Sequence, residues 1–487
     1  MDNWIILGTL AAYKLMLLGV GLWAANRNKS ESDFFLGGRG LGPWVAGLSY
    51  AASTSSAWVL LGVSGFIYTT GLSALWMIPG ILMGYVVVWV WLGPRIRAET
   101  EARGHVTMTD YMAAGAKGAM RKAIALWSAL LVLFCFIFYI AAQFGAAAIA
   151  FESQFGLGHF ESVAIGAAVI LIYSLMGGFW AVSVTDTIQG ALMAIIAIAL
   201  PVAALLAAGG PGEVFATLSA NEPSAFLSWT GERPAFLFLG FAMGIASIGL
   251  GTFGQPHLIA RLMAVKDDAA RKRGFAIAMG WAVIVYAGMS TLALSGRALL
   301  GGGQEGEAMF YTLAAELFPP VLAGLVIAAV LSAVMSTVDS LLIATSAAVA
   351  HDMGVARAMP GREVLISRVV MTALCVLAVV LAMTLPASIF SRVLFSWSAL
   401  GAAFGPILFA RVAGVEPKPA AILLAITAGF FTTVLFYIYG QIGGDSLLAR
   451  LAALPGDPFE RIFPWAVPLI LVFTWRQSRR AELSPDS

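Results

Sequence analysis

Charged residues are scarce in this sequence. Asp, Glu, Lys and Arg make up only 11% of its 487 residues, whereas a soluble domain carries about 25%. Hydrophobic residues reach 60%, and no long polar segment interrupts the apolar stretches. Most of the surface must therefore face something other than water. We expect one membrane-embedded domain over residues 1–487 and no separate soluble domain.

The chain also has few residues that bind metals or form disulfides. Its two cysteines, Cys135 and Cys375, lie inside apolar runs, and its four histidines are far apart. These spacings predict neither a disulfide framework nor a zinc or haem site. The basic residues are scattered between apolar segments, so nucleic-acid binding is not predicted. No paired nucleophile and base is present, and we expect no enzyme.

Apolar stretches long enough to cross a bilayer recur along the chain, because a hydrocarbon core of about 30 Å requires about 20 apolar residues. We count about thirteen and predict an all-α polytopic membrane protein. The expected spans are 4–24, 44–68, 72–93, 123–150, 160–178, 185–208, 235–256, 274–296, 319–350, 365–385, 388–410, 419–440 and 460–475.

The basic residues predict how these spans are oriented. If the N-terminus is outside, most Lys and Arg residues fall in internal segments. The external segments then contain only Arg233, Arg297, Arg392, Arg450 and Arg461. Because loops rich in Lys and Arg stay on the cytoplasmic side, we expect the N-terminus outside and the C-terminus inside.

Two blocks of five spans suggest an inverted repeat. The first repeat covers about 42–208 and the second about 235–412, and they begin on opposite sides of the membrane. Each opens with an unusual helix, rich in hydroxyls at 48–58 and broken by glycines at 244–254. Interrupted segments at matching positions indicate the binding site of an inverted-repeat transporter, although close helix packing through small residues gives a similar pattern. The extra helices are 4–24, 419–440 and 460–475.

Two carboxylates inside the spans point to a polar site, since each costs roughly 2.5–3.5 kcal/mol to insert. Asp186 lies near the start of the sixth span, where a helix N-cap is the alternative. Asp339 lies deep in the ninth span, so we expect it to face a cavity, an ion or a partner. Ser336 lies four residues after Ser332, three before Asp339 and four before Ser340. Spacings of three or four residues predict that these side chains share one helix face. Such oxygens are the ligands that Na⁺ needs.

Tyr139 and Gln143 lie four residues apart in the fourth span. A buried Gln needs hydrogen-bond partners, so this face either lines a polar cavity or packs through the tyrosine against another helix.

Six short sequence motifs are distributed along the chain. They are SDFFLGGR at 32–39, GGF at 177–179, VTDTIQ at 184–189, GTFGQPHLIAR at 251–261, AVMST at 333–337 and GAAFGP at 401–406. Together they resemble the sodium:solute symporters over nearly the whole chain, most closely the sodium/proline branch. The resemblance implies a core of five plus five helices in an inverted repeat, with one extra helix before it and two after.

The resemblance also implies where ligands bind. The main sodium site corresponds to carbonyl groups of Ala52, Ser55 and Ala333 and the hydroxyls of Ser336 and Thr337. A second sodium or proton site, present in some members, corresponds to Asp186, Ser336, Asp339 and Ser340. The solute site corresponds to Ser53, Thr54, Ser56, Tyr139, Ile248 and Thr252.

Two solute-site positions depart from the proline branch. Thr54 stands where that branch has Asp, and Ile248 stands where it has a Trp that contacts substrate, whereas Tyr139 is kept. We therefore expect sodium-coupled symport, by alternating access, of a small polar organic solute: an amino acid such as proline, or a small carboxylate. Na⁺ is the expected coupling ion. The other expected partners are the solute and the lipid bilayer, with the chain as a multi-pass protein of a bacterial inner membrane.

Two alternatives remain open from the sequence. One is a symporter of the same fold driven by protons through Asp186 and Asp339. The other is a membrane sensor that binds a solute without transporting it.

Overall fold

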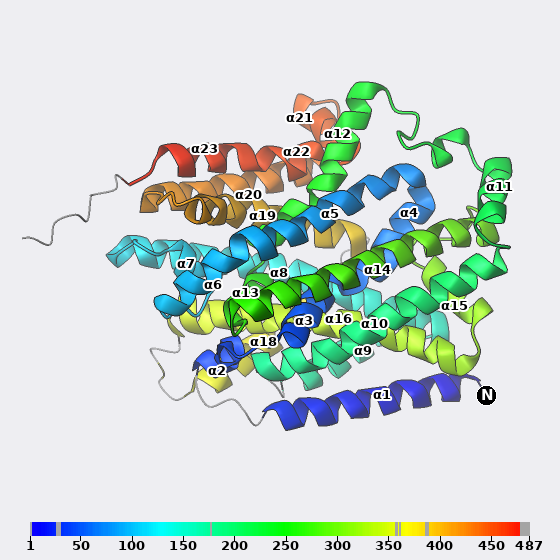
Figure 1. Ribbon diagram of the computed structural model, residues 1–487, viewed down its shortest axis with the longest axis horizontal. Helices are drawn as coiled ribbons and strands as arrows, with labels where there is room; N and C mark the ends of the chain where they lie inside the picture. Colours follow the sequence, from blue (N-terminus) through cyan, green and yellow to red (C-terminus); the bar gives the residue numbers. More distant parts are fainter. Residues whose placement is uncertain are drawn as a thin grey trace, which may run out of the picture.

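The computed structural model describes residues 2–25, 31–175, 178–355, 359, 362–384 and 389–477. Within these residues the chain is helical almost throughout (Figure 1), and the only β-structure consists of two isolated bridges. The all-α class predicted from the sequence is confirmed for this part of the chain.

Eleven of the described helical stretches are long and apolar enough to cross a membrane. Each corresponds to one of the predicted spans, because an apolar run of this length satisfies its backbone hydrogen bonds in lipid only as a helix. They are Trp4–Trp23, Pro43–Thr70, Leu72–Ala102, Gly118–Glu152, Phe179–Ala207, Ala235–Gly254, Asp268–Leu300, Pro320–Asp352, Leu365–Thr384, Ile389–Val412 and Pro419–Ile442.

The remaining two predicted spans fall on shorter helices. The span at 160–178 corresponds to α9 (His159–Ser174), and its residues 176 and 177 lie outside the described residues. The span at 460–475 falls on a bent segment, made of the end of α22 (Pro458–Arg461), the turn η8 (Phe463–Trp465) and α23 (Ala466–Thr474). The total of thirteen spans therefore stays a prediction.

One predicted boundary is wrong in a way that matters for the site. The sixth span was expected from residue 185, but α10 runs from Phe179 to Ala207 with Gly178 as its N-cap. Asp186 therefore lies about two turns inside the helix. The N-cap alternative for Asp186 is excluded, because a residue at this depth cannot reach the free N–H groups of the first turn.

Six helices surround the centre of the molecule (Figure 1). Helix α3 packs against α10, α14 and α16. On the other side, α8 packs against α16, and α19 packs against α8 and against the glycine-interrupted segment at 244–254. α1 lies along the lower edge of Figure 1 against α16 and α10. The bounds are Asp2–Ala25 for α1, Pro43–Ala57 for α3, Gly118–Phe155 for α8, Asp268–Leu300 for α14, Pro320–Ala347 for α16 and Ile389–Val412 for α19.

The other helices form the periphery and the two ends. They are α2 (Glu31–Leu36), α5 (Met77–Val86) continuing through η4 (Val87–Leu92) into α6 (Gly93–Ala102), α7 (Met108–Met112), α11 (Pro211–Asn221), α15 (Met309–Leu317), η7 (Ala348–Asp352) at the end of α16, α18 (Glu363–Thr384), α20 (Pro419–Ile442) and α21 (Leu447–Ala452).

Both interruptions expected from the sequence are present. The first helix breaks at Ser56, where φ is 39° and ψ is −175°, and continues through the wide turn η2 (Trp58–Val63) into α4 (Ser64–Thr70). The second runs as α12 (Ala235–Ala246), tightens into the 3₁₀ segment η6 (Ser247–Gly254) and resumes as α13 (Pro256–Ala264). A positive φ at a residue other than glycine is uncommon, and such a break frees backbone carbonyls from helical hydrogen bonds.

Gly249 allows η6 to lie directly against α5. A β-carbon added to Gly249 would lie 2.1 Å from the carbonyl oxygen of Gly80, and backbone cannot move aside cheaply. We predict that Gly249→Ala destabilises the protein by about 1–3 kcal/mol or more, seen as a lower melting temperature in detergent. Gly280→Ala is the matched control in α14, because nothing lies within 4 Å of its added β-carbon. Equal melting temperatures for the two variants would refute this account of the packing.

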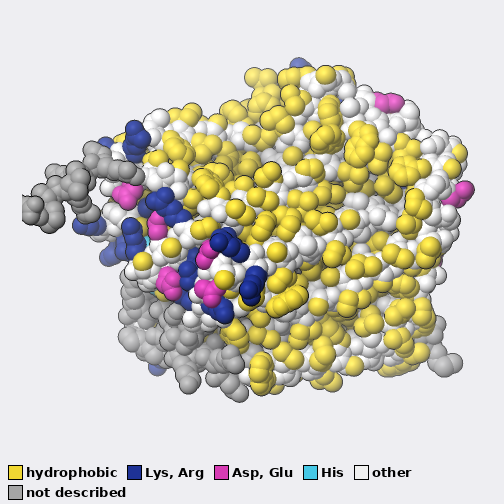
Figure 2. Space-filling view, in the orientation of Figure 1, with side chains coloured by type: hydrophobic (Ala, Val, Ile, Leu, Met, Phe, Trp, Pro, Cys, Tyr) yellow, Lys and Arg dark blue, Asp and Glu magenta, His cyan; other side chains and the backbone are white. Residues whose placement is uncertain are grey.

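Positive charge gathers at one end of the molecule. Figure 2 shows the Lys and Arg side chains of this face clustered at the end where α6 and α7 lie, beside a broad hydrophobic surface. Two arginines of the segments expected to be internal hold helix ends together. The Arg97 guanidinium donates to the carbonyl of Val265 at 2.9 Å, and that of Arg411 donates to the carbonyl of Met112 at 2.7 Å. α6, α7 and the ends of α13 and α19, which lie in or next to segments expected to be internal, thus meet at one basic rim.

Candidate functional site

Two hydroxyls of α16 face the interruption of α3. The Ser336 Oγ lies 3.4 Å from the carbonyl oxygen of Ala52, and the Thr337 Oγ1 lies 3.5 Å from that of Ser53. The Ser336 Oγ also lies 3.1 Å from the Ala333 carbonyl. All of these residues are buried, and the contacts between the helices are long for O–H···O hydrogen bonds. The result is a loose cluster of oxygens between two helices that are nearly 300 residues apart.

Four of the five predicted sodium-site residues meet in this cluster. The exception is Ser55, whose carbonyl accepts the N–H of Trp58 at the break and whose buried hydroxyl has no partner among the described residues. The neighbouring carbonyl of Ser53 takes its place against Thr337. Carbonyls freed by a broken helix and nearby hydroxyls form the kind of donor set that holds Na⁺ in transporters of this architecture.

Asp186 is paired with an arginine. The Arg261 Nη2 lies 2.8 Å from the Asp186 Oδ2 and 2.6 Å from both the Ser53 Oγ and the Ser340 Oγ. The Ser49 hydroxyl donates to the same Asp186 oxygen at 2.8 Å. The two charged side chains are 1% and 0% exposed. We call these five residues the Asp186–Arg261 cluster. Its guanidinium contacts Asp186 and Ser340, two residues of the predicted second sodium or proton site.

Arg261 is the main residue that the sequence analysis missed, because it was counted only among the basic residues of an internal segment. The short helix α13 positions it, and its Nη1 donates to the carbonyl of His257 at 2.7 Å. A signal was available: Arg261 ends the motif at 251–261, directly after the broken helix. An arginine in an otherwise apolar segment needs a charged partner when it is buried.

The predicted single polar face of α16 is divided between two neighbours. Ser340 points to α3 and the Asp186–Arg261 cluster, whereas the Ser332 hydroxyl lies 2.7 Å from that of Tyr13 in α1. Asp339 follows the second direction, since it lies close enough to Lys14 of α1 for a Coulomb interaction. Ser332 and Asp339, which are seven residues apart, lie on one stripe of the helix. Ser336 and Ser340, which are four residues apart, lie on the neighbouring stripe. The structure thus brings Asp186 and Ser340 together, while Asp339 lies near Lys14 of α1 and Cys375 of α18.

The predicted solute residues are all buried, but they do not all face one place. The Ser53 hydroxyl belongs to the Asp186–Arg261 cluster, and the Thr54 Oγ1 donates back to the carbonyl of Tyr50 at 2.7 Å. Ile248 and Thr252 lie in η6, which packs against α5 and α19. The Thr252 hydroxyl bonds back to the Gly249 carbonyl.

Polar groups without partners gather where α3 breaks and α8 passes. The Tyr139 hydroxyl lies beside Ser56 and Trp397, yet it has no hydrogen-bond partner among the described residues. The Gln143 Oε1 accepts the N–H of Ala57 at 3.2 Å, whereas its Nε2 is unpaired within the same residues. Buried polar groups are rarely left unpaired, so these donors and acceptors fit a polar ligand.

Trp397 of α19 connects the two broken helices. Its ring lies 6.3 Å from that of Trp58, centre to centre, in a stacked arrangement. On its other side, a β-carbon added to Gly251 of η6 would lie 2.9 Å from that of Trp397. The indole N–H has no partner among the described residues. Nothing in its local sequence marked this tryptophan.

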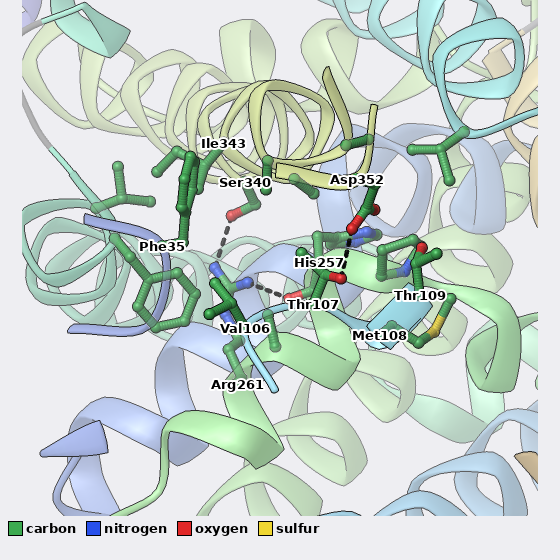
Figure 3. Close-up of a pocket in the computed structure, with 18 residues that line it drawn as sticks. Phe35, Val106, Thr107, Met108, Thr109, His257, Arg261, Ser340, Ile343 and Asp352 are labelled. Atoms are coloured by element: carbon green, nitrogen blue, oxygen red, sulfur yellow. Dashed lines mark hydrogen bonds between the residues drawn. The ribbon is translucent and has the colours of Figure 1, made fainter. Parts of the chain in front are cut away.

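A pocket reaches the Asp186–Arg261 cluster (Figure 3). Arg261, His257 and Ser340 line it together with Thr107 and Asp352. The last two belong to the end of the molecule expected to face the cytoplasm. The cluster therefore lies between this pocket and the oxygens around Ser336.

A second polar group ties α7 to the end of α16. Ligand atoms of Asp110, His351 and Asp352 lie within 4.8 Å of one another. The His351 Nε2 lies 2.8 Å from the Asp110 Oδ2, and the Thr107 hydroxyl donates to Asp352 at 2.7 Å. Asp110 and His351 are 241 residues apart, so no local spacing could predict their meeting.

The charge of Asp110 should stabilise the fold. Burial alone would raise the pKa of Asp110, but His351 and the backbone N–H groups of Val106 and Thr107 hold it well below its ordinary value. A lowered folded pKa means that this stability is present above about pH 4 and is lost as the pH falls through the folded value. At pH 7 we predict that Asp110→Asn costs about 2 kcal/mol and lowers the melting temperature. Exposed Asp445 supplies the control Asp445→Asn. A melting temperature for Asp110→Asn equal to that of the control would contradict this prediction.

These features define a polytopic membrane transport protein, with two interrupted helices meeting at a buried polar centre. The model of the sodium:solute symporter family matches residues 34–412, so the chain belongs to that family. The high-affinity proline transporter PutP of Bacillus subtilis (strain 168) is 31% identical over 446 residues, which cover 88% of this chain and 93% of the relative. The sodium/proline symporter of Escherichia coli (strain K12) is 32% identical over 451 residues, covering 90% and 89%.

Solved structures show the same fold. A Na⁺-coupled sialic acid symporter in a substrate-bound outward-open state aligns with a TM-score of 0.77 at 18% identity, covering 96% of both chains. A transporter of the nucleobase-cation-symport-1 family aligns with a TM-score of 0.56 at 14% identity, covering 92% of this chain and 94% of the other. The family predicted from the six motifs is confirmed. The chain is a multi-pass plasma-membrane protein and a sodium-coupled symporter of a small solute.

Proposed function

We propose that this chain uses the sodium gradient to take up a zwitterionic amino acid by alternating access, with L-proline as the first solute to test. The observation that carries the proposal is the approach of the Ser336 and Thr337 hydroxyls to the carbonyls of Ala52 and Ser53, at 3.4 and 3.5 Å. The names of the relatives at 31% and 32% identity support the choice of proline.

In this proposal Na⁺ binds between α16 and the break of α3. Its ligands are the carbonyls of Ala52, Ser55 and Ala333 and the hydroxyls of Ser336 and Thr337. The long contacts between these helices shorten around the ion. The Ser55 carbonyl gives up its hydrogen bond from the Trp58 N–H and binds the ion instead. Because the ion joins the two helices, its binding also fixes the backbone around Ser56.

The solute binds on the other side of that backbone. We assign its carboxylate to the unpaired donors Tyr139 and Gln143, next to Ser56. Trp397 and Ile248 form the apolar wall, and Thr54 and Thr252 complete the lining when their hydroxyls turn from the backbone. Sodium binding and solute binding are then coupled through one segment, since both ligands order residues 52–56.

The Asp186–Arg261 cluster closes the route from this centre to the pocket at the basic rim. We propose that Asp186 and Ser340 take a second cation only where Arg261 has withdrawn, because the guanidinium uses the same oxygens. Asp339 would join that site only after turning from α1. With the cluster closed, one Na⁺ accompanies each solute.

The architecture that we propose for this cycle is one domain over 1–487 with thirteen spans. Two inverted five-helix repeats, at about 42–208 and 235–412, form its core, with the N-terminus outside and the C-terminus inside. Figure 2 supports this orientation, because the Lys and Arg side chains that it shows gather at the end where α6 and α7 lie, and α6 and α7 belong to a segment predicted to be internal. Eleven long apolar helices and the short helices α9 and α23 support the number of spans.

Proteoliposomes containing the purified protein test the coupling. One charge moving through 100 mV supplies about 2.3 kcal/mol, which corresponds to roughly fifty-fold accumulation of solute. We expect radiolabelled L-proline to accumulate under an inward sodium gradient and to stay near equilibrium under a pH gradient of equal size. Accumulation driven equally by the pH gradient would favour proton coupling. Binding of L-proline without any uptake would favour a sensor.

A further inference from the structure

Helix α1 carries a lysine near its midpoint, on the side that packs against α16. The buried residues Ile6, Leu10 and Leu17 mark this side, because residues three or four apart share one helix face. Lys14 lies on the same face, four residues after Leu10 and three before Leu17. A lysine at a helix end can reach the aqueous interface, whereas one at the midpoint costs roughly 2.5–3.5 kcal/mol to insert. The Lys14 ammonium therefore needs a partner inside the protein.

The charged residue of α16 on this side is Asp339. α1 and α16 pack against each other (Figure 1), and the Tyr13 hydroxyl lies 2.7 Å from that of Ser332. One residue further along α1, the Lys14 ammonium donates to the thioether sulfur of Met335. Met335 and Asp339 are four residues apart, so their side chains are neighbours on the surface of α16. The opposite charges of Lys14 and Asp339 are close enough to attract each other.

The place of Asp339 in the sequence gives its carboxylate two possible roles. Asp339 lies three residues after Ser336 and directly before Ser340, and these two hydroxyls belong to the predicted second cation site. A side chain occupies one rotamer at a time, so the carboxylate lies either toward α1 or toward that site. We propose that Lys14 is a built-in counter-ion that holds Asp339 toward α1 and takes the place of a second coupling cation, which leaves this chain with a single bound Na⁺.

The balance of charge supports this assignment. Each acid of the predicted second site has a cation of the chain itself beside it: the Arg261 Nη2 lies 2.8 Å from the Asp186 Oδ2, and Lys14 attracts Asp339. Neither pair has a net negative charge left to offset the cost of taking another Na⁺ out of water. Lys14 also precedes the residues that match the family model, 34–412, so this counter-ion comes from outside the matched region.

Equilibrium binding of radiolabelled Na⁺ to the purified full-length protein tests the role of Lys14, because it requires neither solute nor uptake. The inference rests on the proposed function only in assigning the first Na⁺ to Ser336 and Thr337. We expect the unaltered protein to bind one Na⁺ per chain and Lys14→Met to bind about twice as much at saturation, because the carboxylate left behind needs a new cation. Mildly alkaline buffer keeps a proton from taking that place.

Three further variants separate the charge of Lys14 from the packing of α1. Lys14→Arg keeps the charge and should bind one Na⁺ per chain. Tyr13→Phe is the matched control, because it removes the contact with Ser332 but no charge, and it should also bind one. Lys14→Met/Asp339→Asn removes both charges and should return binding to one. If Lys14→Met is too unstable to purify, the double variant should recover the monodisperse fraction in detergent, since neither charge is then left alone.

The role of Lys14 is refuted if the unaltered protein already binds two Na⁺, or if Lys14→Met binds no more than the unaltered protein. It is also refuted if Lys14→Arg or the neutral double variant behaves as Lys14→Met does. Failure of the proposed function looks different: proteoliposomes would accumulate no L-proline under a sodium gradient, although the amount of bound Na⁺ still responded to Lys14 as expected.

Discussion

Ser336→Ala/Thr337→Ala is expected to remove sodium-driven uptake while leaving the protein folded. The double substitution deletes two of the proposed oxygen ligands and leaves only backbone carbonyls at the break of α3. If each hydroxyl contributes about 1.5 kcal/mol toward the charged ion, their loss weakens sodium binding roughly a hundredfold or more. The measurement is the initial rate of L-proline uptake into proteoliposomes as the external sodium concentration is varied.

Ser332→Ala is the matched control on the same helix. Its hydroxyl lies against Tyr13 of α1 and the carbonyl of Ala328, away from the break. The control should keep both the rate and the sodium dependence of the unaltered protein. A normal sodium dependence in the double variant would mean that Ser336 and Thr337 do not bind the coupling ion.

The membrane architecture could be predicted because each span is a local property of the chain. α1 and α20 are simple apolar runs, and their ends fall close to the predicted ones. The start of α10 was placed too late, because Phe179 to Val184 carry no N-cap signal and the helix begins directly after Gly178. The segment at 460–475 was predicted as one span, yet Phe463–Trp465, with Pro464 at its centre, forms a separate tight turn within it.

The candidate site could be predicted only where the resemblance supplied the pairing of distant helices. Hydroxyl spacing alone placed Ser336 and Asp339 on one face, although their neighbours are different helices. Arg261 escaped notice because its partner Asp186 lies 75 residues away, and composition does not reveal which buried charges pair. Trp397 was missed for the same reason, since its contacts with Trp58 and Gly251 are purely tertiary.

Asp186→Asn is expected to be among the most destabilising single substitutions in the chain. It leaves the Arg261 guanidinium buried without a counter-charge, and breaking a buried ion pair from one side typically costs about 3–5 kcal/mol. Arg261→Gln should cost a similar amount, because it leaves the Asp186 carboxylate with only serine hydroxyls. Both effects should appear as lower melting temperatures and as a smaller monodisperse fraction in detergent.

The double variant Asp186→Asn/Arg261→Gln distinguishes a paired charge from two separate contacts. Neutral amides in place of both charges avoid the uncompensated charge, so the double variant should be more stable than either single one. Lys272→Gln is the control, because its ion pair with Asp268 is 71% and 52% exposed and is worth no more than about 1 kcal/mol. A double variant no more stable than the single variants would exclude an energetic coupling between Asp186 and Arg261. A stable double variant that no longer accumulates L-proline under a sodium gradient would assign the pair to closure of the inner route, since its fold would be intact.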